Sequence, residues 1–178
     1  MLKTFVVPRG VATALLMLVL SVGEVSASEA KVGFSPGGSA QTLVLDTIKQ
    51  ARQQLDVAAY SFTSNVIAEA VRDATRRGVA VRVIADAEAN SGKYSAVTFL
   101  ANQGVNVRIS DRYASMHNKF IITDQQTVQT GSFNYSASAD KRNAENVLVL
   151  NNVPALASRY SQEFNRLWAE STPVKANY

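Results

Sequence analysis

Apolar strand-like segments alternate with amphipathic helical segments through the first two thirds of the chain, and this alternation constrains the fold more than any other feature. The helical segments have clear ends: residues 64–78 begin at Ser64 or Asn65, and Gly78 and Gly104 close two of the segments. Strands connected through helices run parallel, with the helices packed on the faces of the sheet. The alternation therefore predicts an α/β domain.

The remaining segments complete this prediction. Strands are expected at 31–35, 55–60, 79–86, 105–110, 117–124, 127–133 and 146–150. Helices are expected at 39–52, 64–78, 94–104 and 153–171, with Ser39 as a possible cap of the first. A tight turn at residues 124–126 should join its two flanking strands in a hairpin. We therefore expect one domain over residues 28–178, with a mixed β-sheet flanked by helices on both faces.

The first 27 residues have the pattern of a secretory signal peptide. Lys3 and Arg9 precede an apolar run from Val11 to Val22, and small residues follow it. Cleavage is expected after residue 23 or residue 27. The apolar run is shorter than the roughly 20 residues that span a bilayer, and an uncleaved membrane anchor is the alternative. The mature protein is then expected in the periplasm or outside the cell, without stable membrane association.

Composition limits the chemistry that the chain can perform. It has no cysteine and one histidine, so thiol nucleophiles and thiolate metal sites are excluded and a zinc site would need several carboxylates. Asp86, Glu88 and Asp111 are the neighbouring carboxylates that could form a metal cluster, although Asp86 and Glu88 could equally belong to a cap and a solvated first turn. We expect neither a metal nor a cofactor. The net charge of +4 favours an anionic partner only mildly.

The single histidine lies close to a lysine. On a regular strand alternate side chains share a face, so His117 and Lys119 should point the same way, and Asn118 and Phe120 the other way. Asp124 falls at the turn, too far along the strand to touch His117. The resulting spacing is H-x-K-x4-D.

A second group of polar residues follows on the next strand. Ser132 and Asn134 are two residues apart and are expected on one face, and Gly131 leaves room for another group to approach closely. Glu145 stands at the start of the strand after that. Lys119, Ser132 and Asn134 are donors suited to phosphate oxygens. A carboxylate bound to one imidazole nitrogen would raise the nucleophilicity of the other nitrogen.

These segments together resemble the phospholipase D superfamily. Residues 117–124 match its HxKxxxxD signature, and residues 131–134 match the G-(G/S)-x-N segment that follows, within a resemblance that covers about residues 30–170. The overall pattern is most similar to the small secreted bacterial endonucleases of that superfamily. The resemblance implies that His117 is the nucleophile and forms a phosphohistidine, and that Lys119 binds the phosphate.

The same resemblance implies roles for the other members of the group. Asn134 would bind the phosphate as well, with Ser132 assisting. Glu145 would orient His117, and Asp124 would be a supporting member of the motif.

The larger members of the superfamily carry two copies of the motif, whereas this sequence has one. In-line displacement at a phosphodiester needs a nucleophile on one side and an acid on the leaving-group side. One histidine cannot serve both sides in one step. We therefore expect a homodimer with one active site at its twofold interface, where the second copy supplies the second His117.

Basic residues on the expected surface would contact nucleic-acid phosphates without reading sequence. They are Arg72, Arg76, Arg77, Arg82, Arg108, Arg112, Lys141 and Arg142. Glu69 and Asp73 share a helix with three of them, so an ordinary solvated face is the alternative. Three aromatic side chains, Tyr60, Phe62 and Tyr113, could stack on bases or belong to the core.

Three hypotheses for function remain. The leading one is a metal-independent, sequence-non-specific endonuclease that acts on DNA or RNA. The second is a lipid phosphodiesterase of the phospholipase D or cardiolipin hydrolase type, retained at a membrane by residues 11–22. The third is a non-catalytic nucleic-acid-binding module, and the concentration of His117, Lys119, Ser132 and Asn134 argues against it.

Overall fold

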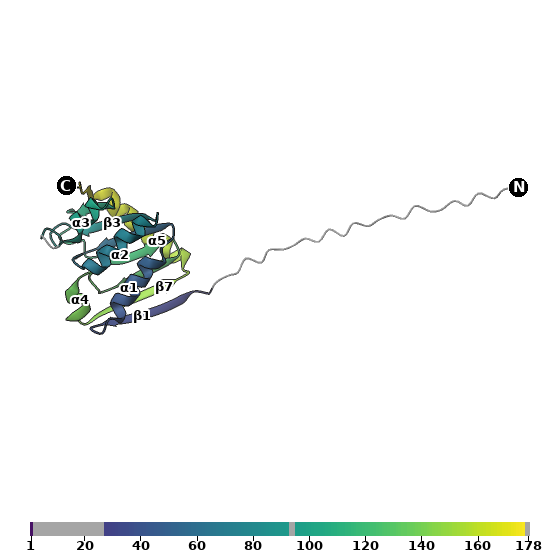
Figure 1. Cartoon of the computed structure of the whole chain (residues 1–178), viewed down its shortest axis with the longest axis horizontal. Helices are drawn as coiled ribbons and strands as arrows, with labels where there is room; N and C mark the ends of the chain where they lie inside the picture. Colours follow the sequence, from purple (N-terminus) through teal and green to yellow (C-terminus); the bar gives the residue numbers. More distant parts are fainter. Residues whose placement is uncertain (2–26, 93–94, 177–178) are drawn as a thin grey trace.

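A mixed β-sheet with helices on both faces forms the part of the chain that the computed structural model describes, residues 1, 27–92 and 95–176 (Figure 1). The strands are β1 (Glu29–Ser35), β2 (Gln54–Ala59), β3 (Ala80–Asp86), β4 (Asn106–Ser110), β5 (Lys119–Thr123), β6 (Thr127–Gly131), β7 (Glu145–Asn151) and β8 (Thr172–Pro173). The helices are α1 (Ser39–Gln50), α2 (Asn65–Arg76), α3 (Ala96–Asn102), α4 (Ala137–Lys141) and α5 (Pro154–Glu170). The predicted fold class is confirmed.

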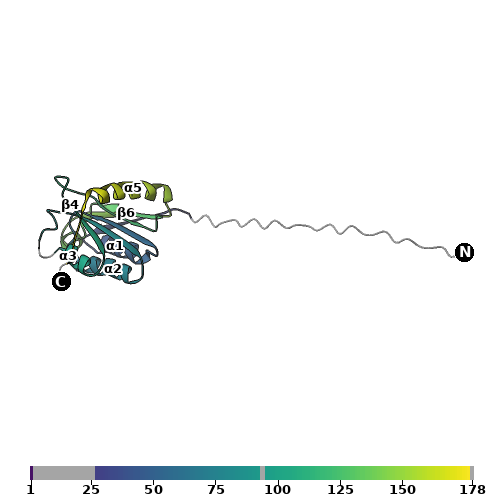
Figure 2. The ribbon, with the colours of Figure 1, turned by 90° about the horizontal axis from the view of Figure 1, so that it is seen from above.

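The helices form two layers around the sheet. Figure 2 shows α5 above the sheet and α1, α2 and α3 below it. Val44 of α1 and Ile67 of α2 are fully buried in the lower core, while Phe164 of α5 packs in a separate upper core with Phe120 and Ile122 of β5. Each strand of the centre therefore buries both faces, which accounts for its continuous apolar sequence.

The order of the strands is β1-β7-β6-β5-β2-β3-β4-β8, and only β2, β3 and β4 form parallel pairs. The first strand runs in the same direction as β2 but lies at the edge, where it pairs antiparallel with β7. The meander β5-β6-β7 lies between β1 and β2 in the sheet. Local periodicity does not predict which strands pair when they are far apart in the sequence, as β1 and β7 are. The short elements α4 and β8 were not predicted, because they span too few residues to show a period.

Several predicted ends of elements can be compared with the structure. Ser64 caps α2 by accepting a hydrogen bond from the Ile67 N–H at 3.4 Å, and Gly78 has a φ of 87°, both as predicted. The prediction that Ser39 caps α1 is wrong, because Gly38 occupies the cap and the Ser39 hydroxyl bonds to the backbone of Phe34.

The predicted signal peptide lies outside the described residues, except for residues 1 and 27. No helix within the described ranges is long and apolar enough to cross a bilayer.

The hairpin between β5 and β6 has the predicted tight turn. Asp124 and Gln125 have φ values of 52° and 55°, and the Gln126 N–H donates to the Thr123 carbonyl at 3.0 Å. Positive φ at both central positions defines a type I′ turn, whose twist matches that of the flanking strands.

Gly131 ends β6 at a point where the backbone of β7 approaches closely. Its φ is 149°, and a Cβ added there would lie 2.2 Å from the Asn146 carbonyl oxygen. The group that approaches closely at this glycine is therefore the backbone carbonyl of Asn146.

We predict that Gly131→Ala lowers the free energy of unfolding by about 2 kcal/mol or more, because a methyl group would displace the Asn146 backbone and strain the φ angle. Gly92→Ala is the matched control, since a Cβ there meets nothing within 4 Å. That control should change stability by no more than about 1 kcal/mol. Urea unfolding of both variants measures the difference, and equal stabilities would show that β6 and β7 can separate at no cost.

Candidate functional site

Loops at one end of the sheet surround an open hollow of about 450 Å³. It is lined by His117, Lys119, Gly131, Ser132, Asn134 and Glu145. These residues come from the start of β5, the end of β6 with the loop that follows, and the start of β7, which are neighbours in the sheet. The structure thus brings together every predicted site residue except Asp124.

His117 lies just before β5 and not on it. Lys119 pairs with Ala59, the last residue of β2, so the sheet ends there and His117 is exposed in the preceding loop. Ser132 and Asn134 likewise follow the end of β6. The prediction that His117, Ser132 and Asn134 lie on strands is therefore wrong, but the side chains of each predicted pair do point to the same hollow.

Lys119 carries a buried charge directly beside His117. Its side chain is 7% exposed, and its Nζ lies 2.9 Å from Nδ1 of His117 and donates to the His117 carbonyl at 2.7 Å. Burial lowers the pKa of the Lys119 ammonium, and the Glu145 carboxylate opposes that shift. An ammonium that is poorly hydrated and held at the edge of a hollow is well placed to bind an anion.

Tyr60 completes the environment of these two groups. Its ring centroid lies 4.3 Å from that of His117, and the Lys119 Nζ lies 5.0 Å from the centre of the Tyr60 ring. From the sequence, Tyr60 was a candidate only for base stacking or for the core. Tyr60 immediately follows β2, and the end of β2 pairs with the start of β5. This pairing could have been used to predict that Tyr60 lies beside His117.

Glu145 is held by neighbours other than the histidine. Its Oε2 accepts a hydrogen bond from the Ser132 hydroxyl at 2.6 Å, and its Oε1 accepts one from Asn143 at 2.9 Å. Within the described part of the chain it makes no hydrogen bond to His117. Glu145 therefore orients Ser132 in the single chain, and the expected contact with the imidazole is not formed there.

Asn134 has an unsatisfied side chain. Its Oδ1 is buried and has no hydrogen-bond partner among the described residues. Buried polar atoms are ordinarily paired, but Oδ1 is an acceptor and a phosphodiester has no donor to offer it. Asn134 also carries an amide donor of the kind that phosphate oxygens accept.

Asp124 lies at the other end of β5, away from the hollow. Its carboxylate accepts backbone N–H groups from Arg52, Gln53 and Gln54 at 2.9, 2.7 and 2.9 Å. Burial alone would raise the pKa of Asp124, but these backbone hydrogen bonds lower it below its usual value. Asp124 therefore joins the start of β2 to the end of β5. It was predicted among the catalytic residues, but its contacts are structural.

Asp86 and Asn90 fix the loop that carries His117. The buried Asp86 carboxylate accepts the Met116 N–H at 2.8 Å and the Ala89 N–H at 2.9 Å. The Asn90 amide donates to the carbonyls of Tyr60 and Asp86 at 2.6 and 2.8 Å. Asp86 is thus occupied by backbone groups, and no set of three or more His, Asp or Glu side chains in the described ranges is arranged to hold a metal ion.

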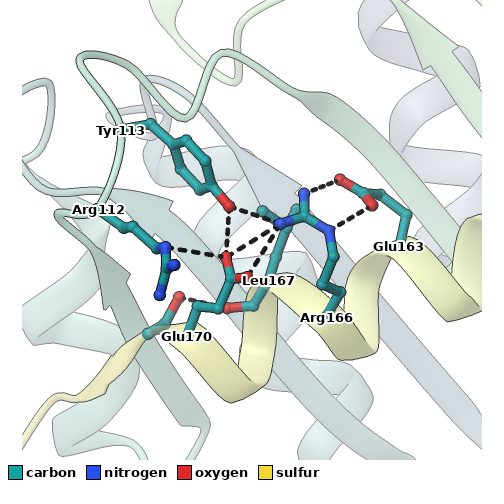
Figure 3. A network of polar contacts seen from close by, with 7 residues as sticks. Arg112, Tyr113, Glu163, Arg166, Leu167 and Glu170 are labelled. Carbon is teal, nitrogen blue, oxygen red and sulfur yellow. Dashed lines mark hydrogen bonds and ion pairs between the residues drawn. The ribbon is translucent and has the colours of Figure 1, made fainter.

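A network of ion pairs attaches the same loop to α5 (Figure 3). The Tyr113 hydroxyl contacts both Glu170 and Arg166, and Arg166 bonds in turn to Glu163 and Glu170. The Tyr113 hydroxyl and the Arg166 guanidinium lower the pKa of the Glu170 carboxyl. The loop before His117 is therefore attached at two points: Met116 bonds to Asp86, and Tyr113 bonds to α5.

Known proteins share both the sequence pattern and the architecture. Residues 44–168 match a family model described as "Cardiolipin synthase, PLD-like domain". A phospholipase D of Rickettsia bellii is 35% identical over 144 residues, which are 81% of this chain and 71% of that protein. The human mitochondrial cardiolipin hydrolase is 32% identical over 146 residues, which are 82% of this chain and 58% of that protein.

Solved structures of proteins from the same superfamily have the same fold. The crystal structure of Nuc from Salmonella typhimurium, a phospholipase D family member, superposes with a TM-score of 0.83 at 36% identity, over 84% of this chain and all of that one. NucT from Helicobacter pylori superposes with a TM-score of 0.77 over 83% of this chain and all of its own, and at 24% identity it supports the fold alone.

We predict that Lys119→Met separates activity from stability. Methionine keeps the length of the side chain and removes a buried charge, so the melting temperature should equal or exceed that of the wild type. Hydrolysis of a simple phosphodiester should fall by about 10³, because the donor to the phosphate is lost. Lys31→Met, at an exposed residue of β1, is the control and should change neither property. A variant that melts much earlier, or one that keeps its activity, would contradict this role for Lys119.

Proposed function

The chain belongs to the phospholipase D superfamily, and we propose that it is a metal-independent endonuclease that hydrolyses the phosphodiester bonds of DNA or RNA without sequence preference. Membership of the superfamily supports phosphodiesterase activity. The observation that carries the finer proposal is the hollow in which an exposed imidazole, a buried ammonium and an unpaired carboxamide meet. We further propose that residues 1–27 direct the protein to the periplasm or the medium.

The reaction proceeds in two displacements at phosphorus. A ring nitrogen of His117 attacks the phosphorus, the bond to the leaving oxygen breaks, and a phosphohistidine forms. Water then attacks the phosphohistidine, releases the phosphate product and restores the imidazole. Lys119 and Asn134 donate to the non-bridging oxygens, where charge builds up in both steps. Ser132, held by Glu145 at 2.6 Å, adds a hydroxyl to the same rim.

The acid for the leaving oxygen comes from a second copy of the chain. The described residues of one chain offer a single imidazole at the hollow, and the leaving group departs on the side opposite the nucleophile. A twofold axis through the hollow would bring the second His117 to that side. It would protonate the leaving oxygen in the first step and remove a proton from water in the second.

Two exposed apolar residues near the hollow offer a surface that a second copy could cover. Val32 and Phe34 on the edge strand β1 are 60% and 57% exposed. Gly33 between them faces α1, so their side chains project from the opposite face of the sheet. Phe34 is paired with Asn146, which bonds to Ser132 in the rim of the hollow. Lys119 and Glu145 point to the α1 face of the sheet, so the patch offers a second copy a surface next to the hollow but on the other face.

Lipid hydrolysis is the second candidate, because relatives are named phospholipase D and mitochondrial cardiolipin hydrolase. Apart from Gly131, however, every side chain that lines the hollow is polar or charged. A phosphodiester in a hydrated polymer fits such a lining, whereas acyl chains would need apolar walls next to the reacting phosphate.

We predict that the purified protein degrades plasmid DNA or RNA in excess EDTA, because the reaction relies on imidazole and ammonium groups. Cardiolipin and phosphatidylcholine vesicles in parallel reactions should remain intact. His117→Asn should abolish nuclease activity while the unfolding curve stays that of the wild type, since the residue is exposed.

Activity that EDTA removes and a divalent metal restores would contradict the proposed chemistry. Hydrolysis of vesicles without hydrolysis of nucleic acid would favour the lipid phosphodiesterase. Wild-type activity in His117→Asn would remove the nucleophile from the mechanism.

A further inference from the structure

Most of the basic side chains that could contact nucleic acid are used within the fold. Two on α2, Arg72 and Arg76, pair with Asp73, and Arg77 bonds to backbone carbonyls at the end of α1. Arg82 pairs with the buried Asp56, Arg108 bonds to the carbonyls of Trp168 and Ser171, and Arg112 approaches Glu170. The arginines along this edge are therefore already bound to groups of the fold, which makes the edge a poor track for a polyanion.

Lys141 and Arg142, at the end of α4, differ from these six. Both are exposed. The Lys141 ammonium makes no hydrogen bond or ion pair with any residue of the described ranges, and the Arg142 guanidinium bonds only to the neutral Ser138 hydroxyl at 3.0 Å. Two adjacent cations thus have no counter-charge bound to them in the described part of the chain.

Their position is fixed at the rim of the hollow. Asn143, the next residue, donates to Glu145 at 2.9 Å, and its carbonyl accepts the Ser35 hydroxyl at 3.1 Å. Three Cα–Cα steps separate Arg142 from Glu145, so these Cα atoms lie within about 11 Å of each other. Measured along the axis of duplex DNA, that length contains about three phosphates of one strand.

The acidic groups near this pair are directed elsewhere. Asp140 precedes Lys141, but its Oδ1 is buried, so its carboxylate is turned toward the protein. Glu145 is held by Ser132 and Asn143 inside the hollow. The outward surface at the end of α4 therefore keeps the charge of its two cations.

On the basis of the nuclease function proposed above, we propose that Lys141 and Arg142 form a second phosphate site, which holds backbone phosphates of the polynucleotide flanking the scissile one. This site would bind the polymer without contact to a base, and it would make the site in the hollow prefer a polyanionic chain over an isolated phosphodiester.

The test compares a polymer with a minimal substrate. The double variant Lys141→Gln/Arg142→Gln is assayed against plasmid DNA over a range of salt concentrations and against bis(p-nitrophenyl) phosphate, which carries the scissile phosphate and no flanking one. For plasmid, the slope of log kcat/KM against log salt concentration should become less negative by about 2, one for each lost phosphate contact. KM should rise. Hydrolysis of the minimal diester should stay at the wild-type rate.

Lys49→Gln/Arg52→Gln is the matched control, since it removes the same charge from exposed residues at the opposite end of the sheet. Its salt dependence should remain that of the wild type. An unchanged slope for the Lys141/Arg142 variant, or an equal loss in the control, would overturn the second phosphate site and leave the nuclease function intact. Equal losses on plasmid and minimal diester would also overturn it, because the pair would then act within the hollow.

The wild-type protein provides the separate check on the underlying function. Hydrolysis of the minimal diester without hydrolysis of either plasmid or RNA would refute the nuclease function and, with it, the second site. Weaker binding of the variant to cardiolipin vesicles, with plasmid hydrolysis unchanged, would instead assign the two cations to a lipid surface.

Discussion

The buried ammonium of Lys119 is the group on which the rest of the site depends. A charge that is only 7% exposed must be compensated by the protein, and here the partners are the His117 carbonyl and ring, the face of Tyr60 and the carboxylate of Glu145. These partners come from the ends of β2, β5 and β7. Holding the charge in place therefore also fixes the imidazole, the aromatic ring and the carboxylate around one hollow.

The position of Lys119 depends on carboxylates that do not line the hollow. Asp124 binds three N–H groups at the start of β2, and thereby fixes the register in which Ala59 pairs with Lys119 at the other end of the same two strands. A shift of one residue would turn Lys119 to the opposite face of the sheet. Asp86 performs a similar task for the loop of His117 through the Met116 N–H.

Much of this arrangement could be predicted from the sequence, and the exceptions have physical reasons. The α/β class followed from periodicity, and the grouping of His117, Lys119, Ser132, Asn134 and Glu145 followed from the spacing of polar residues around successive strands. The edge position of β1 depends on pairing with a strand more than 100 residues away in the chain, which local patterns do not encode. The exact end of β5 depends on where its partner β2 stops, so the sequence placed His117 on the strand instead of before it.

Partners of individual side chains were the least predictable feature. Glu145 was expected at the imidazole and instead bonds to Ser132 and Asn143, and the arginines of α2 were expected on the surface and bind groups of the fold. Both outcomes depend on which polar atoms meet after the loops close. The count of histidines, unlike these contacts, can be read from the sequence. Because there is only one, a second chain is expected at the site.

The most direct test of that expectation is the activity of a mixed dimer. Wild-type and His117→Asn chains with different tags are combined, the heterodimer is isolated through both tags, its size is checked by sedimentation, and its nuclease activity is measured per dimer. A site shared by two imidazoles predicts that the heterodimer is as inactive as the His117→Asn homodimer. A heterodimer with about half of the wild-type activity, or a fully active wild-type monomer, would show that one His117 is sufficient and would contradict the shared site.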